Sequence, residues 1–169
     1  MEKNLKSAYT SFDNLEHILS ALTWENALCM RVCIRYGLRL GDVLTLTPDQ
    51  LKRGRFILTE HKTGKKRRIQ ITGKLRDDLL SISNPFWVFP GRNDPKKHRT
   101  RQAVWADVKR ASKAFRLNHI SPHSARKVFA VGLRERGYTP DEIRRILNHS
   151  DLATTYIYCY SDLITTPTK

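Results

Sequence analysis

Near its end the chain reads His149-Ser150-Asp151-Leu152-Ala153-Thr154-Thr155-Tyr156-Ile157-Tyr158. An imidazole precedes a short helical segment, and a phenol follows at the far end of that segment. Ser150 is suited to be the N-cap, and Asp151 favours the first helical turn. A tyrosine hydroxyl is a poor nucleophile unless a neighbour takes its proton or stabilises its anion. The stretch therefore directs attention to cationic side chains elsewhere in the chain.

Charge is the strongest global feature of this sequence. The 169 residues include 31 Lys and Arg against 16 Asp and Glu, which gives a formal net charge of +15. Such an excess predicts a polyanionic partner, because binding it releases condensed counterions. Nucleic acid is the first candidate, and an anionic membrane surface or a ribosome-like assembly is the alternative. No apolar run is long enough to cross a bilayer, and no secretory segment follows Met1.

The length fits one domain whose core needs no disulfide or metal staple. Of the three cysteines, Cys29 and Cys33 share an apolar helical face, and Cys159 has no obvious partner. Cys29 and Cys33 are best explained as small buried hydrophobes. A reducing, intracellular setting fits the three cysteines best.

Helical patterns account for most of the chain. Residues 1–12 form a polar lead-in, and Asp13 is a plausible cap for the first helix. Gly37 ends an apolar, central helix, and Pro48 closes the short helix after it. Proline at the first helical position and capping residues mark two later starts. We expect helices near 13–22, 24–36, 38–46, 73–81, 100–115, 121–136, 139–148 and after 150.

Two strands are expected where the hydrophobic period changes, at 56–59 and 68–71, with 61–66 as a hairpin tip. A lysine-loaded hairpin can reach into a groove of DNA. Solvated lysines that protect an edge strand are an equally good interpretation of Lys65 and Lys66. Lys62 lies closest to a strand and is better held. Residues 86–91 read as a short apolar strand or a core-tucked loop.

Arginine and histidine occur at places where an anion could be held. Arg39 stands at a junction between two helices among apolar neighbours, which requires either an internal pair with Asp42 or an external anion. His123 and Arg126 share one stripe at the start of the clearest helix. Two donors at the positive end of a helix are well placed to bind a phosphate.

These motifs in order resemble the catalytic domain of the tyrosine recombinase (phage integrase) family. The motifs that carry the resemblance are Tyr36-Gly37-Leu38-Arg39-Leu40-Gly41-Asp42, Lys62, His123-Ser124-Ala125-Arg126, Leu147-Asn148-His149-Ser150-Asp151-Leu152 and Tyr158. The resemblance covers residues 10–160 approximately and includes the spacing from His149 to Tyr158. It implies an α+β fold, mostly helical with a small antiparallel β-hairpin (DNA breaking-rejoining enzyme-like), as one catalytic domain over 1–169 with 161–169 as a short tail.

The resemblance also implies a role for each site residue. Tyr158 would attack a DNA phosphodiester and become joined to the 3′ phosphate. Arg39 and Arg126 would grip the non-bridging oxygens, which suits planar guanidinium forks. The remaining roles are general acid for Lys62, proton transfer for His123, a hydrogen bond to the phosphate for His149, and orientation of the site for Asp42.

Other expectations concern partners. Double-stranded DNA would lie along basic positions, namely Lys65, Lys66, Arg67, Lys97, Arg99, Arg101, Lys109 and Lys113. Copies of the full-length protein would self-associate on DNA as a synaptic tetramer. No phosphate-binding glycine loop and no carboxylate cluster for Mg²⁺ is present, so no metal or cofactor is expected. The family setting implies a cytoplasmic, bacterial or phage-encoded protein that acts at the nucleoid.

Some features depart from the family pattern. Asn148 stands where glycine is common, and a position with φ > 0 tolerates asparagine. Residues 1–12 stand in place of the family's N-terminal core-binding domain, so we expect a trimmed or naturally minimal protein. A type IB topoisomerase-like enzyme and a non-catalytic DNA-binding accessory protein are the alternatives. Among the rival phenols, Tyr156 is expected in the core and Tyr160 at a flanking surface or interface.

Overall fold

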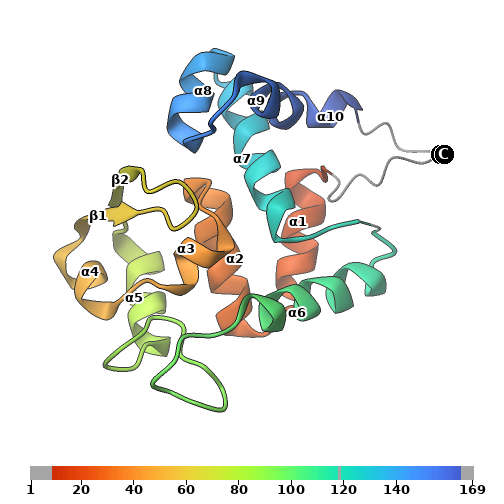
Figure 1. The fold of residues 1–169 in the computed structure, drawn as a ribbon. Helices are drawn as coiled ribbons and strands as arrows, with labels where there is room; N and C mark the ends of the chain where they lie inside the picture. The colour runs from red at the N-terminus through yellow and green to blue at the C-terminus, as the bar shows by residue number, and fades with distance from the viewer. Residues whose placement is uncertain (1–8, 118, 165–169) are drawn as a thin grey trace.

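The computed structural model describes residues 9–117 and 119–164, and it consists mostly of helices with a small two-stranded sheet at one edge (Figure 1). The elements in chain order are α1 (Phe12–Ser20), α2 (Trp24–Tyr36), α3 (Leu40–Leu44), α4 (Pro48–Arg53), β1 (Arg55–Thr59), β2 (Lys66–Gln70), α5 (Gly73–Ile82), α6 (Arg101–Ala114), α7 (Pro122–Glu135), α8 (Pro140–Leu147), α9 (Leu152–Cys159) and α10 (Ser161–Ile164). The expected α+β class, mostly helical with an antiparallel hairpin, is confirmed.

Most helix starts follow the predicted caps. At α7 the N-cap is Ser121, which directly precedes Pro122 and whose hydroxyl accepts a hydrogen bond from the His123 amide. At α8, Thr139 and Glu142 form a reciprocal capping box. The start of α1 was misassigned, because Ser11 and not Asp13 caps it, and Thr10 is already buried. The polar lead-in at 1–8 lies outside the described residues.

Pro48 begins a helix instead of only closing one. Thr47 and Gln50 form a capping box around Pro48 at the first position of α4. This signature is the same one that predicted α8, so the sequence did carry the information. The interpretation of Pro48 as a stop was therefore incomplete.

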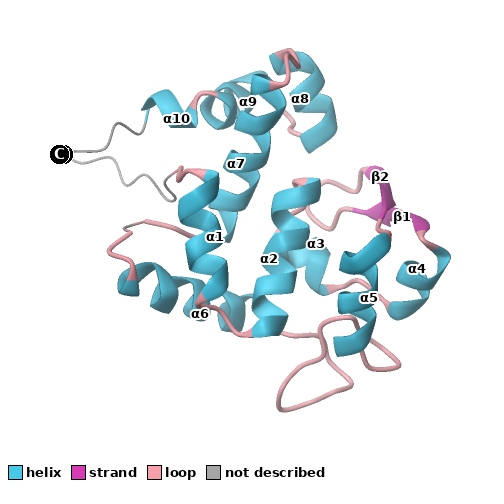
Figure 2. Ribbon diagram, turned by 180° about the vertical axis from the view of Figure 1, so that it is seen from behind, coloured by secondary structure: helices cyan, strands magenta, loops and turns pink. Residues whose placement is uncertain are grey.

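The sheet is a single antiparallel pair of β1 and β2 (Figure 2). Arg55 faces Gln70, and Thr59 faces Lys66. Phe56, Leu58 and Ile69 point into the core, while the alternate residues face outward. This period of two fixes the register, because a slip by one residue would expose the whole apolar set. The pairing places the turn after β1 next to α3. Residues 86–91 form a loop, with Val88 and Phe89 fully buried.

Two apolar clusters make up the core. The larger one joins α1, α2, α3, α5 and α6 to the hairpin, and the smaller one lies between α7, α8 and α9. Cys29 and Cys33 are free and buried, as expected, and Cys159 is free and buried as well. Helix α7 packs on α2 and on α9, so it connects the two clusters. Gly37 ends α2 with φ 59, and a Cβ there would lie 2.6 Å from Cε1 of Phe129 in α7.

The predicted tail begins with a docked helical turn. The Arg134 guanidinium of α7 donates to both carboxylate oxygens of Asp162, at 2.8 and 2.7 Å. Ser161 is buried, so residues 161–164 belong to the folded domain, and 165–169 lie outside the described part. No helix in the described part is long and apolar enough to cross a membrane.

Candidate active site

The predicted site residues meet around one hollow between the hairpin, α3, α6 and α7. Its volume is about 640 Å³, and it is bordered by Arg39, Asp42, Lys62, Arg101, His123 and Arg126 together with His61 and Trp105. Segments that are far apart in the chain therefore bring their cations to one place. His149 and Tyr158 do not border the hollow; His149 contacts Arg126, and Tyr158 contacts His149.

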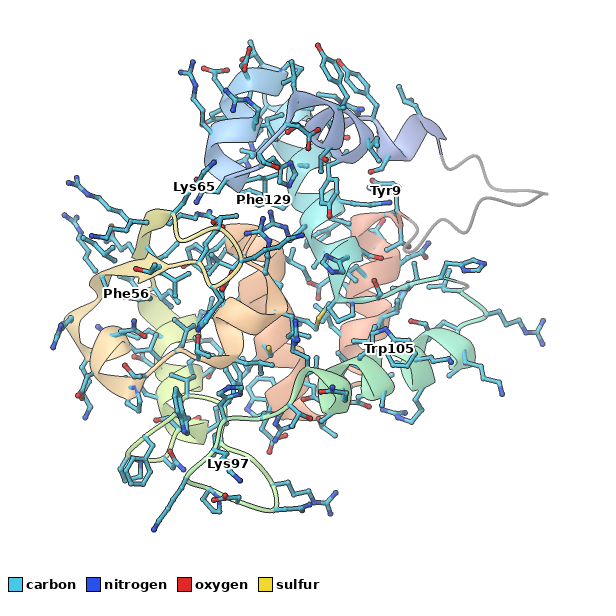
Figure 3. All side chains as sticks on the ribbon, viewed as in Figure 1. Tyr9, Phe56, Lys65, Lys97, Trp105 and Phe129 are labelled. Carbon is cyan, nitrogen blue, oxygen red and sulfur yellow. The ribbon has the colours of Figure 1, made fainter. Side chains whose placement is uncertain are left out.

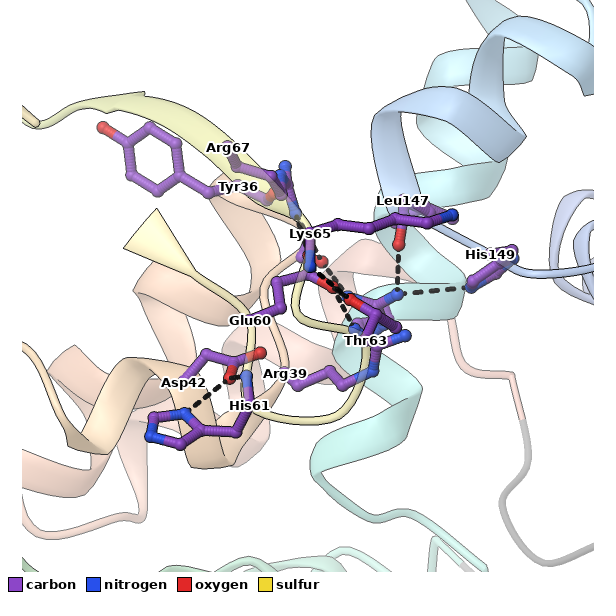
Figure 4. A network of polar contacts seen from close by, with 12 residues as sticks. Tyr36, Arg39, Asp42, Glu60, His61, Thr63, Lys65, Arg67, Leu147 and His149 are labelled. Atoms are coloured by element: carbon purple, nitrogen blue, oxygen red, sulfur yellow. Dashed lines mark hydrogen bonds and ion pairs between the residues drawn. The ribbon is translucent and has the colours of Figure 1, made fainter. Parts of the chain in front are cut away.

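Arg39 pairs with Glu60 and not with Asp42. Arg39 is the N-cap residue of α3, and its Nη1 donates to Oε2 of Glu60, whose side chain is fully buried (Figure 4). Among the described residues this is the only hydrogen bond of the Arg39 guanidinium. Its remaining N–H groups are therefore available to an anion in the hollow.

Asp42 anchors the turn that carries Lys62. Its Oδ1 accepts from the backbone amide of His61 at 2.9 Å and lies 3.0 Å from the ring nitrogen Nδ1 of the same residue. Asp42 is buried, whereas the His61 side chain is 66% exposed. Because Lys62 follows directly, this double contact holds the lysine at the edge of the hollow. His61 was missed in the sequence because nothing local marks it.

Arg126 lies deeper than expected for a phosphate ligand, with 2% exposure. Its Nη1 donates to the carbonyl of Gly37, and its Nη2 lies 3.1 Å from the carbonyl of Leu147 and 3.2 Å from Nε2 of His149. Burial lowers the pKa of Arg126 to about 10, and the nearby Arg39 guanidinium adds to the effect. Arg126 is therefore a cation at neutral pH that also ties α7 to the ends of α2 and α8.

Both ring nitrogens of His149 are already engaged. Nε2 faces a guanidinium N–H of Arg126, and Nδ1 lies 3.0 Å from Oγ1 of Thr155. The tautomer that these partners assign accepts at Nε2 and donates from Nδ1. Burial, with a smaller contribution from the charge of Arg126, lowers the pKa of His149 to about 4, so the ring is neutral at pH 7. In this arrangement the His149 ring accepts a hydrogen bond from Arg126. This contact differs from the role that the resemblance implies, in which His149 donates a hydrogen bond to a phosphate.

Tyr158 lies half-buried on α9 against the ring of His149. The two ring centroids are 4.8 Å apart at an interplanar angle of 74°, and Nζ of Lys127 lies 6.0 Å from the phenol ring centroid. The N-cap of α9 is Asp151 and not the expected Ser150. Oδ1 of Asp151 accepts a hydrogen bond from the Thr154 amide at 2.6 Å.

The other two phenols form a separate pair. Tyr156 is 46% exposed and stacks on Tyr160 at 5.9 Å, so the expectation that Tyr156 packs in the core was wrong. The Arg134 guanidinium lies over the Tyr160 ring. Neither ring contacts His149 in the way that Tyr158 does.

His123 stands at the rim of the hollow, on the first turn of α7. The residue is exposed, but desolvation by the neighbouring protein lowers the pKa of its ring. The positive charges of Arg126 and Arg39 lower the pKa of His123 further. A ring with this pKa is neutral at pH 7 and can accept a proton.

The expected DNA-contacting residues separate into two groups. Arg67 is 12% exposed and donates to the Tyr36 carbonyl at 2.7 Å, and Arg99 donates to Asn26 at 2.8 Å, so both brace the fold instead of presenting a free cation. Figure 3 shows Lys65 at the hairpin and Lys97 in the loop before α6. The other six expected residues are exposed, namely Lys65, Lys66, Lys97, Arg101, Lys109 and Lys113.

Glu60 is the site residue that sequence reasoning missed entirely. A single glutamate between a strand and a turn has no local signature, and its partners come from distant parts of the chain. Within the described residues, no group of at least three His, Cys, Asp or Glu side chains is arranged to hold a metal ion.

Known proteins resemble this chain in sequence and in fold. Residues 5–163 match the family model described as "Phage integrase family". Tyrosine recombinase XerD of Pseudomonas putida is 28% identical over 153 residues, which cover 83% of this chain and 51% of that protein. The chain spans about half the length of the relatives that it matches.

Solved structures share the fold at low sequence identity. A lambda integrase dimer bound to a COC′ core site has a TM-score of 0.74 at 18% identity, over 94% of this chain and 61% of that one. The XerH site-specific recombinase in its post-cleavage complex with a palindromic difH substrate has a TM-score of 0.71 at 18% identity, over 94% and 51%. With the family model covering nearly its whole length, this chain belongs to the phage integrase family.

Proposed function

We propose that this chain is the catalytic domain of a site-specific DNA recombinase that cleaves and rejoins strands through Tyr158. The observation that carries the proposal is the contact series from Tyr158 to His149 to Arg126 at the hollow where Arg39, Lys62 and His123 also meet. A phenol, neutral imidazoles and fixed cations in one place are what phosphoryl transfer to tyrosine requires.

In the proposed step the Tyr158 oxygen forms a bond to phosphorus, and the bond from phosphorus to the 5′ oxygen breaks. The phenolic proton goes to His123, whose lowered pKa leaves it a neutral acceptor. Lys62 gives a proton to the departing 5′ oxygen. Arg39 and Arg126 stabilise the charge on the non-bridging oxygens. Because one phosphodiester replaces another, the reverse step rejoins strands without nucleotide hydrolysis.

Double-stranded DNA is the proposed partner. Support comes from the net charge of +15, from the exposed cations around the hollow, and from the DNA complexes formed by lambda integrase and XerH. Several copies of the whole protein would assemble on DNA for strand exchange, with the lambda integrase dimer on its core site as the parallel.

Covalent trapping tests the function. The protein is mixed with nicked suicide duplexes randomised around the nick, because the target sequence is not specified by the fold. We expect an SDS-resistant protein–DNA adduct with wild type and with Tyr156→Phe, and none with Tyr158→Phe. Mass spectrometry of the adduct should place the DNA on Tyr158.

An adduct on Tyr156 or Tyr160 would contradict the assignment of the nucleophile. Salt-sensitive binding without any adduct would support the accessory DNA-binding protein instead. Relaxation of supercoiled plasmid by the monomer, with no recombinant product, would favour the topoisomerase-like enzyme.

A further inference from the structure

Glu60 lies where three separate parts of the site meet. Its carboxylate oxygen Oε2 accepts from Arg39 and, at 3.0 Å, from Oγ1 of Thr63 in the hairpin turn. The other oxygen, Oε1, lies 3.6 Å from Nη1 of Arg67 in β2. Figure 4 shows the carboxylate between these groups. The side chain has no exposed surface, so every one of its neighbours is protein.

A buried carboxylate must be paired or neutralised, since its desolvation is costly. Burial by itself raises the pKa of Glu60, but the Arg39 charge and the hydrogen bonds from Thr63 and Arg39 outweigh it and lower the pKa overall. The Asn148 side chain also helps to lower this pKa, although its Nδ2 makes no hydrogen bond. Glu60 is therefore an anion at neutral pH.

The neighbours of Glu60 flank the proposed catalytic groups. Thr63 follows Lys62 directly, and Asn148 precedes His149. Arg39 gives one nitrogen, Nη1, to the carboxylate, which orients the rigid guanidinium plane and leaves its other donors toward the hollow. One carboxylate thus restrains the first arginine and the turn of the lysine.

Building on the recombinase function proposed above, we propose that Glu60 is a positioning residue of the cleavage site. Its negative charge holds the Arg39 guanidinium in the orientation that meets the scissile phosphate, and its contact with Thr63 holds the Lys62 turn in register with it. Glu60 does not touch the phosphate. Its effect is exerted on the rate of the chemical step and not on the affinity for DNA.

The test compares Glu60→Gln and Glu60→Asp with the matched control Glu135→Gln. Glu135 is exposed on α7, and its substitution makes the same change in net charge. Single-turnover adduct formation is measured at saturating randomised nicked duplex, and DNA affinity by a separate titration. We expect Glu60→Gln to form the adduct about 10- to 100-fold more slowly than Glu135→Gln, as for loss of a hydrogen bond to a charged group.

The same titration should give the two glutamine variants DNA affinities within about 2-fold of each other, which is below the effect of one ionic contact. Glu60→Asp keeps the charge and should recover part of the rate. Equal adduct rates for Glu60→Gln and Glu135→Gln would overturn the proposal, as would a rate loss explained by weaker DNA binding.

Thr63→Val supplies a second measurement that does not depend on removing a buried charge. Thr63 is half-buried in the turn, and its substitution removes one donor to Oε2. We expect a slower adduct rate with unchanged circular dichroism. If Glu60→Gln does not fold, a wild-type rate for Thr63→Val overturns the proposal. Absence of any adduct with the wild-type protein would instead reject the recombinase function, and this role with it.

Discussion

At the scale of single residues, the site depends on which atoms of each cation are already engaged. Arg126 uses both terminal nitrogens on protein acceptors, whereas Arg39 gives a single nitrogen to Glu60. The two arginines therefore have different duties in the free protein. Arg126 supplies a fixed charge and braces three helices, and Arg39 is the more accessible of the two to an incoming phosphate.

The pH dependence of folding should report the state of His149. Its pKa is about 4 in the folded protein against an ordinary value of 6.5, so the unfolded chain binds more protons between these values. Stability from this group is complete above pH 6.5 and is lost as the pH falls toward 4. The loss amounts to about 3 kcal/mol for a side chain with 5% exposure.

Urea denaturation at several pH values checks this expectation. The free energy of unfolding of wild type should fall between pH 6.5 and pH 4 more steeply than that of His149→Gln, which cannot titrate. Parallel curves for the two proteins would show that His149 is not held neutral by its burial.

At the scale of elements, the helix that carries Tyr158 relies on its cap. Helix α9 has only 8 residues, too few to be stable alone, so its first turn needs Asp151. The carboxylate of Asp151 accepts from the Thr154 amide and also from the Thr154 hydroxyl at 2.8 Å. Packing of α9 against α7 and α8 supplies the remaining support.

Two neighbouring alanine substitutions distinguish the observed cap from the one expected from sequence. Asp151→Ala should lower the free energy of unfolding by about 1 kcal/mol, because an amide of the first turn loses its acceptor. Ser150→Ala should leave it nearly unchanged, since Ser150 is exposed and Asp151 is the cap. Thermal or urea denaturation of the two variants decides, and a larger loss for Ser150→Ala would refute the assignment.

At the scale of the whole molecule, there are more cationic side chains than the internal ion pairs and hydrogen bonds engage. Arg67 and Arg99 are committed inside the fold, yet exposed lysines remain around the hollow and along α6. On α6, Nζ of Lys109 lies 4.9 Å from the ring centroid of the exposed Trp105. This surface is the one that we expect to follow the phosphates of a duplex.

The salt dependence of DNA binding tests that surface. Lys109→Gln and Lys113→Gln should each reduce the slope of log affinity against log salt by about 0.9 if the lysine contacts a phosphate. Lys74→Gln is the matched control, because Lys74 lies on α5 and pairs with Asp78 at 2.9 Å. Fluorescence polarisation with a labelled duplex measures the slopes. If Lys74→Gln changes the slope as much as the α6 variants do, the assignment of α6 as the DNA-binding surface is contradicted.

The α+β class, most of the helices and the hairpin could be predicted from local sequence patterns, as could the family resemblance on which the choice of site residues rests. Caps such as Ser121 and Thr139 act within one turn of the chain, so the local sequence contains all the information that they need. The pairing of Arg39 with Glu60, the internal position of Arg67 and the outward position of Tyr156 became clear only in the folded chain. The partner of a buried charge comes from a distant segment, and local periodicity carries no record of which segment packs against it.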